Sequence, residues 1–189
     1  MPLFTSLEFN NFKDLFVAQI EDLYDAENRL TEALPKMAQA ANSNQLRQAF
    51  EDHLTETQGH VSRLDQIFRE INVEPKRETC AAMKGLISEG EEMIKAKGDP
   101  DVKDAALIAA GQRVEHYEIS GYGTARAFAR RLGLTQAASL LQQTLQEEKA
   151  ADEKLNNIAE SSVNVQASGA AASASYSTAT AGGTTTTRR

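Results

Sequence analysis

Tryptophan is absent from this sequence of 189 residues, cysteine occurs once, and proline occurs four times. A single cysteine, Cys80, excludes an internal disulfide and a cysteine-based zinc site, so a reducing, cytoplasmic setting is the default expectation. No run approaches the roughly 18 consecutive apolar residues of a membrane-spanning helix, so no membrane association is expected. Residues 1–16 contain Glu8 and Asp14 and lack a basic segment followed by an apolar run, which is unlike a signal peptide.

Positive charge is scarce: 20 lysines and arginines against 27 acidic residues give a net charge of -7. Such a chain repels a phosphate backbone, so nucleic acid is not an expected partner. The hydrophobic fraction of 41% is enough for a core, which excludes a fully disordered chain. Residues 161–189 differ from the rest, because they are almost all Ser, Ala, Thr and Gly and contain no acidic residue. We therefore expect one helical domain over residues 1–160 and a flexible low-complexity tail over residues 161–189.

Apolar residues recur at three- and four-residue steps through the first 160 residues, which predicts helices and no strands. The pattern indicates long helices over residues 7–34, 46–71, 101–132 and 135–159, the last capped by Thr135, and a short helix over residues 83–94. The turns at residues 42–44 and 133–134 are short, so the helices on either side of each turn should pair antiparallel. The predicted fold is all-α: a four-helix bundle of two antiparallel hairpins with a short extra helix in the crossover connection.

Acidic side chains interrupt the apolar face of every long helix near its middle. In chain order they are Glu27, Glu56, Glu115, Glu118, Glu148 and Asp152. Burying one unpaired carboxylate costs several kcal/mol, so burying this many without counter-charge would exceed the roughly 5–15 kcal/mol of a domain's net stability. Two divalent metal ions would supply four positive charges and accept oxygen and imidazole ligands. Six carboxylates exceed that charge, so at least one should lie outside the first coordination shell, stay protonated, or bind in one metal state only.

Some of these acids could instead be solvated residues at the edge of the core, or be neutralised by Arg113 and Arg126. Of the three histidines, His60 lies one turn from Glu56 on the same face and is the expected nitrogen ligand. His53 is the alternative nitrogen donor, or an ordinary core histidine. Tyr122 lies one turn from a predicted ligand and is either a hydrogen-bond donor to a carboxylate or a core residue.

The segments at residues 22–27, 53–57, 113–118 and 147–152 resemble the bacterial YciF/YciE stress-protein family. The resemblance covers residues 7–160 and implies a fold similar to ferritins and rubrerythrins, which hold two metal ions in a four-helix bundle. It also implies a role in stress responses and a homodimer. The related di-iron proteins carry a histidine three residues after a glutamate, whereas Gly59 follows Glu56 and Ala151 follows Glu148 at that spacing.

A dinuclear carboxylate site for iron, or alternatively manganese, is the resulting hypothesis, with reduction of oxygen or peroxide as its chemistry. Glu56 and Glu148 are predicted to bridge the two metals. The other predicted ligands are Glu27, His60, Glu115, Glu118 and Asp152. The competing hypothesis is a non-enzymatic helical interaction module whose buried acids hold no functional metal.

Overall fold

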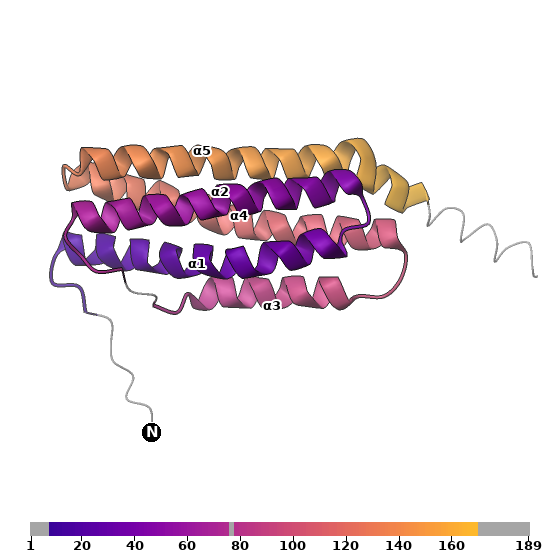
Figure 1. Ribbon diagram of the computed structural model, residues 1–189, viewed down its shortest axis with the longest axis horizontal. Helices are drawn as coiled ribbons and strands as arrows, with labels where there is room; N and C mark the ends of the chain where they lie inside the picture. The colour runs from indigo at the N-terminus through magenta and orange to yellow at the C-terminus, as the bar shows by residue number, and fades with distance from the viewer. Residues whose placement is uncertain (1–7, 76–77, 170–189) are drawn as a thin grey trace, which may run out of the picture.

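The computed structural model describes residues 8–75 and 78–169, and the part of the chain it describes is helical without strands. The helices are α1 (Phe12–Ala40), α2 (Asn44–Glu70), α3 (Ala81–Lys95), α4 (Pro100–Arg131) and α5 (Thr135–Ile158) (Figure 1). The prediction of an all-α fold with four long helices and one short helix is confirmed.

Local chemistry defines the helix ends. The Asn11 side chain accepts a hydrogen bond from the Asp14 backbone N–H at the start of α1, and Asp99 caps α4, which begins with a proline. Gly133, with a φ of 75°, ends α4, a backbone conformation that favours glycine. The prediction that Thr135 caps α5 is wrong, because Thr135 is the first helical residue and the preceding Leu134 makes no side-chain capping bond.

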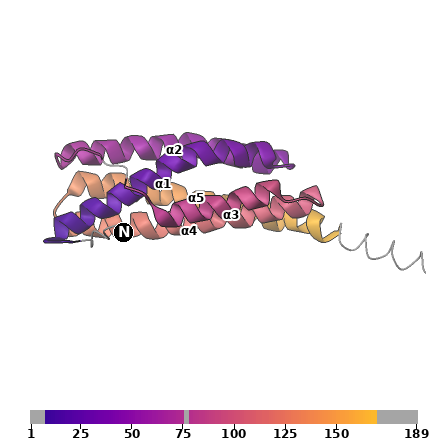
Figure 2. The ribbon, with the colours of Figure 1, turned by 90° about the horizontal axis from the view of Figure 1, so that it is seen from below.

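Two antiparallel hairpins, α1–α2 and α4–α5, lie side by side and form the bundle (Figure 1). The chain returns from one hairpin to the other through α3, which lies along the outside of the bundle against α1 and α4 (Figure 2). The crossover segment that contains α3 carries the chain back along the bundle, so α2 and α4 point the same way (Figure 1). The predicted crossover arrangement of a ferritin-like bundle is therefore confirmed.

The helical chain extends beyond α5, through a π-helical turn η1 (Ala159–Val163), as far as residue 169. Val163 is 1% exposed and belongs to the same apolar cluster as Ile158 and Ala159. The prediction of a flexible tail is therefore wrong for residues 161–169, since a buried valine ties this segment to the bundle. Residues 170–189 of the predicted tail lie outside the described residues.

The apolar core divides into two clusters along the bundle. One contains Leu30, Phe50 and Leu107 near the α1–α2 turn, and the other contains Phe16 and Leu141 near the opposite end. His60, Glu118 and Glu148 lie between the residues of the two clusters along α2, α4 and α5. None of the described helices is both long enough and apolar enough to cross a membrane. The interval between the two clusters is where the buried histidines and several buried glutamates lie.

Asp104 fastens the α1–α2 turn to α4. Its carboxylate is 1% exposed and accepts hydrogen bonds from the backbone N–H groups of Asn42 at 2.8 Å and Ser43 at 2.6 Å. We expect Asp104→Ala to lower the free energy of unfolding by about 2 kcal/mol, because two part-buried donors lose a charged acceptor. Urea unfolding would measure this loss. Asp101→Ala is the control, since Asp101 reaches only the Asn42 side chain, at 3.3 Å near the surface, and equal losses in the two variants would contradict the assignment.

Candidate metal centre

Six ionisable side chains meet in the middle of the bundle, between the two apolar clusters, and each is 5% exposed or less. All four long helices contribute. The six side chains are Glu27 of α1, His53 and His60 of α2, Glu115 and Glu118 of α4, and Glu148 of α5. Burial of this many ionisable groups in one place is rare in a protein core and marks a functional site.

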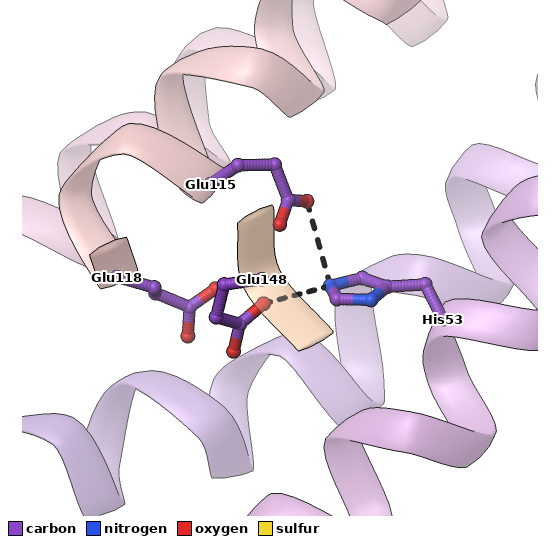
Figure 3. A group of neighbouring side chains, drawn as sticks. All are labelled: His53, Glu115, Glu118 and Glu148. Carbon is purple, nitrogen blue, oxygen red and sulfur yellow. Dashed lines mark ion pairs between the residues drawn. The ribbon is translucent and has the colours of Figure 1, made fainter. Parts of the chain in front are cut away.

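The cluster consists of two groups of potential ligand atoms that share Glu148. The first contains His53, Glu115, Glu118 and Glu148, and the second contains Glu27, His60 and Glu148. Figure 3 shows the first group, in which His53 Nε2 lies 3.4 Å from Glu115 Oε1 and 3.7 Å from Glu148 Oε2. In the second group, His60 Nδ1 lies 3.0 Å from Glu148 Oε1 and 3.3 Å from Glu27 Oε1. Glu148 thus turns one carboxylate oxygen toward each group, which is the arrangement of a bridging ligand.

Each histidine is held by a carboxylate on the side away from the cluster. His53 Nδ1 lies 3.2 Å from Glu56 Oε2, and His60 Nε2 lies 2.9 Å from Glu147 Oε2. Arg63 anchors Glu147 with two further bonds of 2.6 and 2.8 Å. When each outer nitrogen donates to its carboxylate, the inner nitrogen presents a lone pair to the cluster. This is the arrangement in which histidines bind metals in proteins.

Several inward-facing atoms have no hydrogen-bond partner among the described residues. They include both oxygens of Glu118 and of Glu148, Glu27 Oε2, Glu115 Oε2, His53 Nε2 and His60 Nδ1. Tyr122 donates to Glu27 Oε1, which satisfies one oxygen of the cluster. Buried polar atoms are normally paired, so these oxygens and nitrogens facing one point form a set of donor atoms that a cation would satisfy. The donor set therefore fits divalent metal ions.

None of the arginines that the structure describes neutralises the cluster. Arg113 donates to the backbone of Ala109 at the surface, and Arg126 donates to Gln142. Within residues 8–75 and 78–169, no lysine or arginine forms an ion pair with any of the four glutamates of the cluster. The alternative that Arg113 and Arg126 balance the buried acids is therefore wrong, whereas the suggested tyrosine contact is present.

Without metal, burial opposes the charged forms of the glutamates. It raises the pKa of Glu115 to about 8 and of Glu148 to about 7, and it holds that of Glu118 well above the ordinary range. Nearby carboxylates also raise the pKa values of Glu115 and Glu118, and Glu27 raises that of Glu148. Burial by itself lowers the pKa of His60, but its contacts with Glu148 and Glu27 outweigh this and raise the pKa to about 11. The metal-free cluster therefore retains protons that metal ions would displace.

These shifts predict that the metal-free protein loses stability as the pH rises. Between about pH 4.5 and 8 the folded protein holds carboxyl protons that the unfolded chain has released, and from about pH 6.5 to 11 the same holds for His60. We expect the free energy of unfolding in excess chelator to fall by at least about 1 kcal/mol between pH 5 and 9. Urea titrations at several pH values would measure it. A flat profile would contradict the pKa shifts, and Mn²⁺-loaded protein should show the slope weakened or reversed because metal affinity rises with pH.

Two of the predicted ligands lie outside the cluster. The prediction that Glu56 lies on the core face of α2 is wrong: its side chain is 46% exposed, and it contacts the outer nitrogen of His53. At about 100° per residue, Glu56 is rotated by about 70° from the centre of the stripe formed by His53, Thr57 and His60. His53, weighed as the alternative nitrogen donor, points inward instead.

Asp152 is the second predicted ligand that lies outside the cluster. Its side chain is 25% exposed and lies at the edge of the bundle. Its carboxylate is 3.4 Å from Gln112 Nε2 and 3.5 Å from His116 Nε2, both on α4. Its side chain is one methylene shorter than that of glutamate, and it begins one turn beyond Glu148. The remaining predicted ligands, Glu27, His60, Glu115, Glu118 and Glu148, are brought together. Glu147 was not predicted, and nothing in the sequence pairs it with His60 on a different helix.

A cavity of about 80 Å³ leads from the surface between α2 and α5 to the cluster. His53, Glu56 and Glu115 line it, and Lys154 stands among its exposed residues. Water or a hydrated cation can therefore approach His53 and Glu115 without rearrangement of the helices.

Paired hairpins with glutamates and histidines from four helices at the centre define a ferritin-like protein. Within this class, residues 11–168 match the family described as "Domain of unknown function (DUF892)", and the chain belongs to that family. The resemblance to YciF/YciE proteins is confirmed by sequence and by structure. Protein YciF of Escherichia coli strain K12 is 47% identical over 162 residues, which cover 85% of this chain and 98% of that protein.

Two solved structures agree with the fold. The crystal structure of the E. coli stress protein YciF matches with a TM-score of 0.80 and 48% identity, over 82% of this chain and 99% of that chain. The protein YcfI of Rhodopseudomonas palustris, whose description proposes a structural role, matches with a TM-score of 0.77 and 42% identity, over 81% and 98% of the two chains.

Proposed function

We propose that the chain is a stress-response protein that binds two divalent metal ions, iron or alternatively manganese, in the centre of the bundle. The observation that carries this proposal is the pair of ligand groups that share Glu148. His53, Glu115 and Glu118 would bind one ion, Glu27 and His60 the other, and Glu148 both. The link to stress rests on the description of the E. coli relative as a stress protein.

Charge balance supports two ions. With Glu56 and Asp152 outside the cluster, the four buried glutamates Glu27, Glu115, Glu118 and Glu148 carry four negative charges when ionised. Two divalent cations supply four positive charges. The four carboxylates of the cluster therefore balance the two ions, whereas the six predicted from the sequence exceeded them by two negative charges. Oxygen ligands with one nitrogen per ion suit iron and manganese.

Bound as Fe(II), the two ions would supply two electrons, enough to convert hydrogen peroxide and two protons to two waters, or dioxygen and two protons to hydrogen peroxide. The chain contributes the surroundings. Apolar clusters on both sides exclude bulk water, and Tyr122 orients Glu27. Glu56 and the Arg63–Glu147 pair fix the two imidazole rings.

Metal stoichiometry in the wild-type chain and three variants tests the site. We expect the purified full chain, loaded with Mn²⁺ and freed of excess metal, to retain two ions. Glu148→Ala should retain less than one, because Glu148 serves both ions, while Glu27→Ala should retain one. Glu153→Ala, an exposed change on the same helix as Glu148, should retain two. Equal metal content in the Glu148→Ala and Glu153→Ala proteins would rule out the proposal.

A non-enzymatic role is the second candidate, favoured by the structural role proposed for the R. palustris relative. In that case the cluster would either hold no metal or hold it only as a clamp between the four helices. Single-turnover oxidation of the Fe(II)-loaded chain by dioxygen or peroxide separates the two. Loss of Fe(II) no faster than in the Glu148→Ala protein would favour the non-enzymatic role.

A further inference from the structure

A second, apolar cavity lies beneath α3 and shares Glu115 with the polar one. Its volume is about 40 Å³, and apolar side chains of α1, α3 and α4 form its wall, among them Leu34, Met37, Leu86 and Val114. Phe50 and Glu115 line both cavities, so the two approach the metal cluster from different directions and meet there.

The two ends of this cavity differ in exposure. Glu115, at one end, is 3% exposed and belongs to the ligand cluster. Lys36 and Glu91, at the other end, are 57% and 40% exposed and form an ion pair of 3.2 Å between α1 and α3. An exposed pair of this kind contributes little stability and opens readily. The cavity thus leads from the protein surface, under a weak ion pair, to a predicted metal ligand.

Size and polarity limit what the cavity can hold. A volume of 40 Å³ is a few times the roughly 10–15 Å³ that one water needs, which suits a diatomic molecule or a single xenon atom. The leucine, isoleucine and methionine side chains that form most of its wall, between Glu115 and the Lys36–Glu91 pair, offer water no hydrogen-bond partners, so this part of the cavity tends to remain dry. An uncharged, apolar small molecule forms no hydrogen bonds in water, so it loses none when it enters the cavity.

We propose that this cavity is the binding site and entry route of dioxygen to the metal pair. The inference rests on the proposed function and names the oxidant. Hydrogen peroxide carries two hydroxyl groups that an apolar wall leaves without hydrogen-bond partners, whereas dioxygen has no hydrogen-bond donor to leave unpaired. Metal ions and protons would use the polar cavity beside His53, so the two kinds of reactant enter from opposite sides of Glu115.

Gly90 of α3 offers a way to fill the cavity. It is buried and lines the cavity, and an added Cβ would lie 3.9 Å from Met37 Sδ, an ordinary contact. Gly85 lies on the same helix, is exposed, and an added Cβ there would meet nothing within 4 Å. Gly90→Leu and Gly85→Leu therefore both replace a helix glycine by a strong helix former, but only the first occupies the cavity.

Xenon is the first probe. Crystals of the full chain, pressurised with xenon with and without Mn²⁺, should show one xenon atom between Leu34, Leu86 and Val114. It should persist in Gly85→Leu and be absent from Gly90→Leu. If Gly90→Leu does not fold, Gly90→Ala, which narrows the cavity without a steric overlap, should reduce the xenon occupancy. A wild-type cavity free of xenon would overturn the proposal whatever the variants do.

Oxidation of bound Fe(II) is the second probe, with metal content measured on the same samples. Gly90→Leu should slow oxidation by dissolved dioxygen about tenfold, equivalent to a barrier raised by about 1.4 kcal/mol, relative to Gly85→Leu. Oxidation by added hydrogen peroxide should be the same in both variants. Bound iron with equal dioxygen rates in the two variants would refute the cavity alone. Xenon binding in a chain that binds no iron would refute the proposed function instead.

Discussion

Removal of the metal ions should lower the melting temperature of the full chain by about 10–20 °C. An ion present at 100 times its dissociation constant stabilises the folded state by about 2.7 kcal/mol, so two ions give about 5 kcal/mol. Each kcal/mol shifts the melting temperature of a domain of 150–250 residues by about 2–4 °C. The effect is large because the unfolded chain has no counterpart of the site: its ligands come from four helices spread over residues 27 to 148.

Thermal unfolding in Mn²⁺ and in EDTA would measure the difference. The Glu148→Ala chain is the key comparison, since it keeps the four helices but lacks the shared ligand, and it should melt at the same temperature in both solutions. Glu153→Ala should behave like the wild type. A wild-type melting temperature that does not respond to the chelator would favour the interaction module without functional metal.

The sequence was sufficient for the fold because helical periodicity and short turns leave few arrangements. Apolar steps of three and four residues define one buried face per helix, and a turn as short as the one at residues 42–44 can only join antiparallel neighbours. The end of the last helix was less predictable. Val163 stands among small and polar residues with too few apolar neighbours for a periodic pattern, and its burial depends on contacts with the cluster that contains Ile158.

The candidate site was predictable where a glutamate lies at the centre of a buried stripe, as Glu27, Glu118 and Glu148 do. On α2 the sequence predicted Glu56 as a ligand and left His53 only as the alternative to His60, whereas in the structure both histidines face the cluster and Glu56, three residues from His53, does not. A small rotation of the helix about its axis decides whether His53 or Glu56 faces inward, and packing against α4 and α5 sets that rotation. His53 thus becomes a candidate ligand, while Glu56 becomes the carboxylate that orients it.

Hydrogen-bond partners that lie on different helices could not be predicted from the sequence. Glu147 and His60 are 87 positions apart, and their 2.9 Å contact exists only because α2 and α5 pack side by side. The same contact explains how a buried imidazole can present its other nitrogen to the cluster, because Arg63 keeps Glu147 charged against the effect of burial and the pKa of Glu147 is lowered. A single sequence carries no signal of such a pairing.

Glu118→Gln should change protein stability in opposite directions in the absence and presence of metal. The Glu118 carboxyl is fully buried, neither of its oxygens is hydrogen-bonded within the described part of the chain, and its pKa is well above the ordinary value of 4.5. In metal-free protein at pH 7.5 the folded state must therefore take up a proton that the unfolded chain has lost. That uptake costs about 1.4 kcal/mol per pH unit above 4.5, or up to about 4 kcal/mol.

Glutamine has nearly the same shape and needs no proton, so in EDTA at pH 7.5 the variant should be more stable than the wild type by up to about 4 kcal/mol. The gain should shrink toward zero as the pH falls to about 4.5, where the unfolded chain is itself protonated. Exposed Glu153→Gln should show no such gain.

In saturating Mn²⁺ the order should reverse, because glutamine offers no negative oxygen to a metal ion and the variant forgoes the stabilisation of at least one site. Urea unfolding of both proteins, with and without metal and at pH 5 and 7.5, gives the complete comparison. A variant less stable than the wild type in EDTA would mean that Glu118 has a partner in the apo protein. A variant that responds to Mn²⁺ as strongly as the wild type would remove Glu118 from the site. Reversal of the order on metal addition would identify Glu118 as a carboxylate whose burial is unfavourable until a cation binds it.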